Sequence, residues 1–344
     1  MQNQQNFSHW IECSLPAYVS VSNPLQLDAL AGDAGFRRYY RLNTHPSLIA
    51  VNSPPLKEKN PAYVNLSLFL QAHGIKTPKI HAVNFEQGFM LLEDFGERLF
   101  QYQLAREEPT TLYDSAESVL LEIQGCVADS RILPAYDQCK LGQELALFEQ
   151  WFVNKLLGIS LEANEKALLQ QLYTDLIDNA LQQPQVTVHT DYHSRNLMLL
   201  EDGKLGVIDF QDAVCGPITY DLVSLLKDCY LRWPEAWVKK RALDFKQRLE
   251  QSGSLGDTDD DQFMRWFDLM GLQRHIKVLG IFARLSLRDN KNAYLQDIPL
   301  VVRYSIEVMS HYPETAAFSD WFKHKIMPLL NDQPWYTEHV DGEK

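Results

Sequence analysis

The sequence lacks any long apolar run and any secretion signal. No stretch approaches the roughly 20 consecutive apolar residues that a membrane-spanning helix needs. The first residues, MQNQQNFSHWIECSLP, contain neither a basic start nor an apolar core, so we expect no signal peptide. These absences predict a cytoplasmic protein without a membrane partner.

Cysteine is scarce, and its spacing argues against cysteine-based architectures. The chain has five cysteines, an odd number, and no two stand at Cys-x-x-Cys spacing. We therefore expect neither a disulfide framework nor a zinc site built on cysteines. The five are interpreted as small apolar side chains in a reducing compartment.

Positive charge is also in short supply. The 344 residues include 32 Lys and Arg against 45 Asp and Glu, a formal net charge of −13. A protein that wraps nucleic acid needs a basic face to displace counterions from the phosphates, so we expect no nucleic-acid partner. No feature indicates an obligate protein partner. With 45% hydrophobic and 22% charged residues, the composition is that of a globular protein, and the length suits two lobes.

The order of predicted elements divides the chain into two lobes of an α+β protein. Residues 1–92 are expected to form a small, mostly antiparallel sheet with one helix, and residues 97–344 a larger helical lobe. Residues 93–96 lie between them as a hinge. The main predicted strands are 36–42, 48–52, 79–84 and 88–92; the predicted helices include one from Pro61 and those at 110–128, 141–157, 161–181, 220–231, 234–250 and 262–287.

A β-like patch, VHTDYHSRNLMLLEDGKLGVIDFQDA at 188–213, interrupts the helices. Asn196 follows Asp191 by five residues, and Asp209 follows Asn196 by thirteen. Two apolar runs around the turn 201–203 predict a hairpin that returns Asp209 to the neighbourhood of Asn196. All three side chains are thus expected to converge at one end of a two-stranded ribbon.

These three residue types suit phosphoryl transfer, which depends on positioning and charge neutralisation. Asp191 would accept or orient the proton of the attacking hydroxyl. Asn196 and Asp209 would hold Mg²⁺, a hard ion that prefers oxygen ligands. The patch therefore predicts transfer of the γ-phosphoryl group of ATP to a small-molecule hydroxyl, with Asp191, Asn196 and Asp209 as the catalytic centre.

A metallohydrolase is a second interpretation of the patch. His189, Asp191 and His193 alternate, so on a strand they would face one side and bind a transition metal. The downstream histidines lack paired spacing, and Asn196 and Asp209 have no role in such a site. This alternative stays open at the level of sequence.

The stretch HTDYHSRN followed by VIDFQDA resembles the catalytic loop and metal-binding motif of the aminoglycoside phosphotransferase and choline kinase family. In that family, a branch of the bilobal protein-kinase-like fold, the loop reads His-x-Asp-x-x-x-x-Asn. FRRYYRL, GFMLLEDFG, GPITYDLVSLLKDCY and QRHIKVLGIFARLSLRDNKNAYL extend the likeness over nearly the whole chain. They resemble one subgroup, the bacterial anomeric kinases of N-acetylmuramate and N-acetylglucosamine, which work in cell-wall recycling.

The resemblance implies ATP and Mg²⁺ as cofactors, an amino sugar as the acceptor, and roles for further residues. His189 would brace the catalytic loop, and Asp221 would buttress it. Helical spacing places Lys277, Arg284 and Arg288 on one basic face, with Arg274 one turn before Lys277, and this cluster would let Arg274 and Arg284 receive an anionic acceptor. Further acceptor candidates are Arg195, His193 and Asp212. Candidates for ATP binding lie in the glycine-containing turn, the strand after it and the hinge: Gly32, Ala34, Gly35, Arg37, Arg41, Glu93 and Phe95.

One residue of the wider kinase pattern is missing. The strand SLIAVNSPP carries no lysine where the fold usually places its phosphate-pairing lysine. Either an arginine of FRRYYR replaces it, or loop amides and the metal hold the phosphates. This departure leaves a nucleotide-binding pseudokinase open as an alternative, beside a kinase for an aminoglycoside or a choline-like alcohol.

Overall fold

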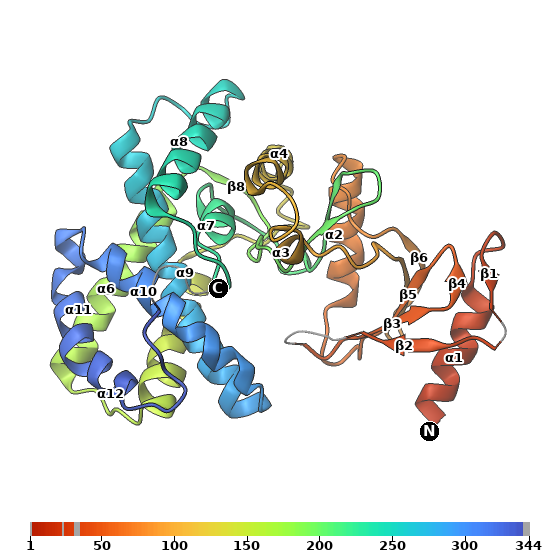
Figure 1. Cartoon of the computed structure of the whole chain (residues 1–344), viewed down its shortest axis with the longest axis horizontal. Helices are drawn as coiled ribbons and strands as arrows, with labels where there is room; N and C mark the ends of the chain where they lie inside the picture. The colour runs from red at the N-terminus through yellow and green to blue at the C-terminus, as the bar shows by residue number, and fades with distance from the viewer. Residues whose placement is uncertain (1, 23, 31–34, 340–344) are drawn as a thin grey trace. The chain divides into compact units, whose positions relative to one another are not determined.

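The computed structural model describes residues 2–22, 24–30 and 35–339, which form two compact units (Figure 1). The first unit comprises residues 1–133 and 195–213, and the second comprises residues 134–194 and 214–344. This division follows contacts within each unit. The predicted lobes, 1–92 and 97–344 with a hinge at 93–96, stay a prediction.

The first unit is built on a five-stranded antiparallel sheet with the strand order β2-β3-β5-β7-β6. The apolar residues of the central strands β5 and β7 are buried, as expected for strands covered on both faces. The four main strands predicted from the sequence are present within two residues at each end. The strands are β2 Leu27–Ala29, β3 Arg38–Leu42, β5 Leu48–Asn52, β6 Ile80–Asn84 and β7 Phe89–Glu93.

An N-terminal helix, α1 Gln2–Ser14, packs on this sheet, although the sequence pattern predicts one helix in this region and not two. Most of its residues are polar, and its main apolar residues, Phe7, Trp10 and Ile11, occupy about one turn. Phe7 and Ile11 lie one turn apart and are buried against strands β3, β5 and β7. Trp10 adds a ring contact with Phe89 at 5.6 Å between centroids, so packing against the sheet holds the helix.

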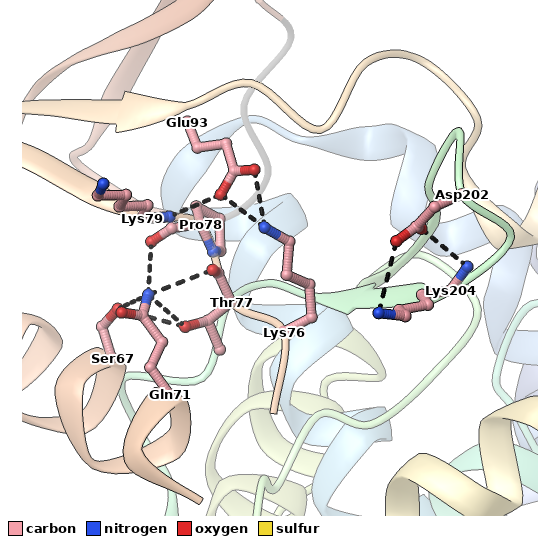
Figure 2. Close-up of polar contacts among 9 residues, drawn as sticks. All are labelled: Ser67, Gln71, Lys76, Thr77, Pro78, Lys79, Glu93, Asp202 and Lys204. Atoms are coloured by element: carbon pink, nitrogen blue, oxygen red, sulfur yellow. Dashed lines mark hydrogen bonds and ion pairs between the residues drawn. The ribbon is translucent and has the colours of Figure 1, made fainter. Parts of the chain in front are cut away.

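Side-chain hydrogen bonds connect the end of α2 to the start of β6. The helix α2 Asn60–Ala72 begins with proline in its first turn, as predicted. Near its end, the Gln71 amide donates to the carbonyls of Thr77 at 3.2 Å and Pro78 at 3.3 Å (Figure 2). The remaining elements of this unit are β1 Ser20–Val21 paired with β4 Thr44–His45, α3 Phe100–Gln103, α4 Pro109–Gly125, β9 Leu197–Leu199 and β10 Leu205–Val207.

The second unit is mostly helical and is organised around α9 Asp260–Asp289. Asp259 caps this helix by accepting the amide of Gln262 at 2.7 Å. Buried residues occur on all sides of α9, which marks it as a core helix. The other elements are α5 Gln138–Leu147, η1 Phe148–Leu156, α6 Ala163–Gln182, β8 Gln185–Val188, β11 Val214–Pro217, α7 Tyr220–Leu226, α8 Glu235–Gln251, η2 Asn292–Asp297, α10 Ile298–Met309, η3 Pro313–Thr315, α11 Ala316–Trp321, η4 Phe322–Ile326 and α12 Met327–Asn331.

Two predicted helices differ in the structure. The helix predicted at 141–157 is divided into α5 and the π-helical segment η1, where the backbone meets Gly280 of α9. The helix predicted at 220–231 ends at Leu226, and Asp228 then turns its carboxylate toward the amides of Ser194 and Tyr230. No helix within residues 2–22, 24–30 and 35–339 combines the length and apolar character needed to cross a membrane.

Candidate active site

The predicted hairpin between Asn196 and Asp209 is present in the first unit. Strands β9 and β10 pair antiparallel, with Leu197 opposite Val207. Beyond the paired strands, the amide of Ile208 donates to the carbonyl of Asn196 at 3.0 Å. Asn196 and Asp209 therefore lie at the same open end of the hairpin.

This hairpin is attached to its own unit on both edges. An amide of β9 donates to the carbonyl of Arg98 at 2.8 Å, and an amide of β10 donates to the carbonyl of Lys76 at 2.8 Å. The Phe95 ring packs against the backbone of Gly206, where an added Cβ would sit 2.4 Å from the ring. At the tip, Asp202 accepts the amide two residues later at 3.1 Å (Figure 2). These contacts fix the strand ends that carry Asn196 and Asp209.

Asp209 has a strained backbone, with a φ of 61°. Positive φ is uncommon for a residue other than glycine, and such strain is typical of functional positions. The Asp209 carboxylate accepts the side-chain amide of Gln211 at 2.7 Å, and the next residue, Phe210, stacks on Tyr63. A carboxylate and an amide oxygen at one hairpin end are donors that suit Mg²⁺, so Asn196 and Asp209 fit this ion.

No group of three or more His, Cys, Asp or Glu side chains suitable for a metal gathers among the residues that the structure describes. The metallohydrolase hypothesis would need such a group, formed by His189, Asp191, His193 and further ligands.

Arg37 is buried, with 6% of its surface exposed, and its guanidinium faces the start of α2. Its Nη2 lies 3.4 Å from the Glu58 carboxylate, and its Nε donates to Ser53 Oγ at 3.3 Å. The guanidinium also lies over the Tyr63 ring, 5.2 Å from its centroid. Glu58 in turn accepts the backbone amide of Phe36 at 2.8 Å, which ties this arginine–glutamate pair to the end of the glycine-containing turn.

Tyr39 connects the Arg37 region with Asp209 electrostatically. Burial raises the pKa of Tyr39 to about 12. Arg37 opposes this rise, whereas the negative charge of Asp209 adds to it. Arg37 and Asp209 are therefore both close enough to the Tyr39 hydroxyl to change its pKa.

The other predicted ATP-binding residues make internal contacts. Arg41 donates to the Asp94 carboxylate at 2.6 Å and to the carbonyl of Gly96 at 2.9 Å. The Glu93 carboxylate accepts Lys76 Nζ at 2.8 Å and the amide of Lys79 at 3.1 Å (Figure 2). The Glu93 amide donates to the Lys79 carbonyl at 2.8 Å. Gly35 is an exposed bend residue that precedes Phe36. ATP binding by Gly35, Arg41, Glu93 and Phe95 stays a prediction, and Gly32 and Ala34 lie outside the described residues.

Residues 189–194 follow β8 in the second unit and are held from both ends of α7. Asp221, in the first turn of α7, accepts the amides of His189 at 2.6 Å and Thr190 at 3.0 Å. Asp228, just beyond α7, accepts both the amide of Ser194 at 3.0 Å and its hydroxyl at 2.5 Å. Burial raises the pKa of Asp221 to about 7, although the two amides and Arg274 act against this rise.

Asp191 stands in this loop with its side chain 44% exposed. Its amide donates to Nδ1 of His189 at 3.2 Å, a contact that suits the bracing role implied for that histidine. Although the side chain is partly exposed, desolvation of its carboxylate acts to raise the pKa of Asp191, but Arg274, Lys277 and the two loop histidines outweigh it and lower the pKa to about 2. The Asp191 carboxylate is thus ionised at and around pH 7.

The chain passes from the second unit to the first between Ser194 and Arg195. Asp191 therefore belongs to one unit, and Asn196 and Asp209 belong to the other. Five residues of fully extended chain span at most about 18 Å, so covalent continuity alone limits the separation of Asp191 from Asn196.

The acceptor candidates have varied surroundings. Arg195 donates to a glutamine side chain of α3 at 3.1 Å, and the His193 ring meets the Tyr230 ring edge-on at 5.5 Å between centroids. Asp212 is exposed. Arg284 is half-buried, and its Nε has no hydrogen-bond partner among the described residues. Acceptor binding by these four residues stays a prediction.

Glu58 and Asp228 did not stand out in the sequence, and Arg274 stood out only as an acceptor candidate. Glu58 precedes its helix, and its pairing with Arg37 arises from tertiary packing. Asp228 follows Asp221 by seven residues, two helical turns, and this spacing was the signal that was available. The contact of Arg274 with Asp191 joins residues 83 positions apart and left no local signal.

Residues 26–267 match the model of the Phosphotransferase enzyme family. The chain is 39% identical over 295 residues, 86% of each chain, to the N-acetylmuramate/N-acetylglucosamine kinase of Pseudomonas putida. It is 36% identical over 322 residues to the protein of that name from Pseudomonas aeruginosa, covering 92% of this chain and 95% of the relative.

Solved structures show the same fold. Choline kinase LicA from Streptococcus pneumoniae superposes with a TM-score of 0.59 at 13% identity, covering 92% of this chain and 100% of that chain. ADP-bound aminoglycoside phosphotransferase APH(2'')-Ib gives a TM-score of 0.58 at 14% identity, covering 88% of this chain and 98% of that chain. The chain belongs to the Phosphotransferase enzyme family, so the predicted family, α+β kinase-like fold and enzyme class are confirmed.

Proposed function

We propose that this chain is an ATP-dependent kinase that phosphorylates the anomeric hydroxyl of N-acetylmuramate or N-acetylglucosamine in cell-wall recycling. The observation that carries this proposal is the similarity to three kinases named for these two sugars, from Pseudomonas putida, Pseudomonas aeruginosa and Neisseria meningitidis. They are 35–39% identical over 86–92% of the chain. A cytoplasmic site of action agrees with five cysteines that are all free thiols.

In this proposal, Asp191 orients the acceptor hydroxyl toward the γ-phosphate of ATP. A carboxylate with such a low pKa is a weak base, so its main work is to position the hydroxyl and to receive its proton late in the transfer. Asn196 and Asp209 would hold Mg²⁺, which neutralises phosphate charge when bound. The strained backbone of Asp209 and its place at the hairpin end support this assignment.

Arg37 takes the place of the missing strand lysine. The kinase fold pairs its phosphate-binding lysine with a glutamate of the following helix. Here Arg37 pairs with Glu58, which precedes α2, and both lie beside the glycine-containing turn. An arginine presents several fixed donors, so it can keep Glu58 as a partner while it offers an N–H group to a phosphate oxygen.

An acceptor panel tests the proposed function. The protein is incubated with Mg²⁺ and ATP and with N-acetylmuramate, N-acetylglucosamine, an aminoglycoside or choline, and ADP release is followed. We expect turnover with the two amino sugars alone, and loss of the reducing end of the sugar as its anomeric hydroxyl is phosphorylated. Turnover restricted to the aminoglycoside or choline would contradict the amino-sugar assignment. Tight ATP binding without turnover of any acceptor would instead identify a pseudokinase.

A further inference from the structure

The backbone carbonyl of Thr190 and the side-chain carboxylate of Asp191 both contact one buried arginine of α9. Arg274 is 2% exposed, and its Nη1 donates to the carbonyl of Thr190 at 2.9 Å. The same Nη1 lies 3.5 Å from the Asp191 carboxylate. One nitrogen therefore contacts both the peptide that leads into Asp191 and the side chain of Asp191 itself.

The peptide that Arg274 contacts is strained. Thr190 has a φ of 77°, and a β-branched residue rarely adopts a positive φ. Its amide is held by Asp221 at 3.0 Å, and its carbonyl is held by Arg274. Such a conformation persists only where the surroundings over-determine it. Asp221 and Arg274 supply that restraint from two different helices, and the direction of the Asp191 side chain depends on it.

Arg274 is itself fixed by a buried polar network. It lies over the Tyr220 ring, 5.6 Å from the centroid, and Tyr220 also accepts Lys277 Nζ at 3.0 Å. Lys277 forms an ion pair with Glu144 of α5 at 3.0 Å, and Glu144 accepts the hydroxyl of Tyr136. A second cation thus stands one turn from Arg274, and its own charge is balanced by Glu144.

We propose that Arg274 is a positioning residue for the reaction, which holds Thr190 in its strained conformation and aims the ionised Asp191 carboxylate. This inference rests on the proposed role of Asp191. It also gives Arg274 a different role from the acceptor binding expected from its place on a basic helix face. With only 2% of its surface exposed, Arg274 offers almost nothing to an acceptor in solution.

The charges around Asp191 predict how its ionisation depends on Arg274. The groups that face it are Arg274 and Lys277 on α9, Asp221 on α7, Cys229 beyond α7, and His189 and His193 in its own loop. Burial and Asp221 favour the protonated form, and the cations favour the ionised form. Without the guanidinium, burial is less well opposed, so the pKa of Asp191 rises.

The test compares Arg274→Gln and Arg274→Lys with a matched control, Arg232→Gln. Arg232 is another largely buried arginine of the second unit, 12% exposed, and it pairs with Glu307. We expect Arg274→Gln to lower kcat by about 10- to 100-fold, since small misplacement of a reacting group costs rates of this order. The KM for ATP should change little. In Arg232→Gln, kcat should remain near wild type even if the melting temperature falls.

Two further readouts separate positioning from a merely structural role. In Arg274→Gln, the low-pH limb of kcat/KM should move to higher pH, and Arg274→Lys should restore the wild-type limb because it restores the charge. In a double-mutant cycle with Asp191→Asn, the losses should be strongly non-additive, because Arg274 acts through Asp191. If the fold-losses in kcat of the two single variants simply multiply in the double variant, the proposal is overturned. A wild-type kcat in folded Arg274→Gln would overturn it as well.

The inference can fail separately from the proposed function. The titration of Asp191 is followed by ¹³C NMR of carboxyl-labelled aspartate, assigned with Asp191→Asn, and needs no turnover. We expect the resonance to titrate below the ordinary aspartate range in the wild type and at higher pH in Arg274→Gln. An unchanged titration would overturn the proposal. If Arg274→Gln does not fold, Arg274→Lys carries the kinetic test, with partial loss of kcat expected and full wild-type kcat as the contrary result. Failure on the acceptor panel alone would contradict only the amino-sugar assignment.

Discussion

Arg37 is the single residue at which this chain departs most clearly from the kinase pattern. It lies outside the strand that usually carries the lysine, yet it is buried and paired with Glu58 beside the glycine-containing turn. Its neighbour Arg38 is exposed and donates to the backbone carbonyls of Gly35 and Arg37. The two adjacent arginines thus have quite different surroundings, although the sequence treats them alike.

This difference gives a prediction at the residue scale. Arg37→Met should raise the KM for ATP by about tenfold or more, because a charge-assisted hydrogen bond to phosphate is worth roughly 1.5–3 kcal/mol. The KM for the acceptor should stay within about twofold. Steady-state kinetics with each substrate varied in turn provides the measurement. Arg38→Met is the control, and equal effects of the two substitutions would contradict the role of Arg37.

A site residue could be predicted from the sequence when the residues that it acts with lie close to it along the chain. Asp191, Asn196 and Asp209 belong to one short patch whose spacing is set by a loop and a hairpin, so local pattern was sufficient to select them. Arg274 reaches Asp191 only through the packing of α9 beside α7. Such a contact is decided by tertiary structure, and no periodicity in the sequence carries it.

Elements show the same distinction between local and long-range causes. Strand β5 was predicted at its observed bounds because its apolar and β-branched residues end at a Pro-Pro turn. Helix α1 was missed because Phe7, Trp10 and Ile11, which contact the sheet, are a short apolar group in an otherwise polar segment. Segment η1 was missed because the π-helical geometry arises where the backbone packs on α9, a cause that lies outside the segment itself.

The contact between α9 and the α5–η1 junction gives a prediction at the element scale. A Cβ at Gly280 would lie 2.4 Å from the carbonyl carbon of Leu147, so the two backbones touch. Gly280→Ala should therefore lower the free energy of unfolding by about 1–3 kcal/mol or more, as overpacking does. Urea unfolding followed by circular dichroism measures the change.

Gly142 of α5 provides the matched control. Its added Cβ would lie 3.9 Å from Ile177, an ordinary contact, and alanine is the better helix former by up to about 1 kcal/mol. Gly142→Ala should thus leave the protein as stable or slightly more stable. If both substitutions have the same effect, close backbone contact at Gly280 is not what shapes η1.

At the scale of the whole molecule, the net charge of −13 opposes the binding of a nucleotide that is itself anionic. In the proposed function, Mg²⁺ and Arg37 would therefore neutralise the nucleotide site locally. Asp209 is the carboxylate that we assign to the metal, so nucleotide binding should depend on Mg²⁺ and on Asp209 together.

Ligand-induced stabilisation measures this dependence. Mg²⁺ with ATP at about 100 times its Kd should stabilise the folded protein by about 2.7 kcal/mol, seen as a rise of several degrees in melting temperature. Asp209→Ala should lose most of this rise. Asp178→Ala, which removes an exposed carboxylate of α6, should keep it. An equal rise in Asp209→Ala would contradict the metal assignment.

The central claim is that Asp191 acts with Asn196 and Asp209 in phosphoryl transfer. The most direct test is the kcat of Asp191→Asn with saturating Mg²⁺, ATP and N-acetylglucosamine, measured beside the Kd for ATP. The account predicts that kcat falls by at least about 10²-fold, the order expected for loss of a positioned proton acceptor, while the Kd for ATP stays within about twofold. A kcat within a few-fold of the wild type would contradict it.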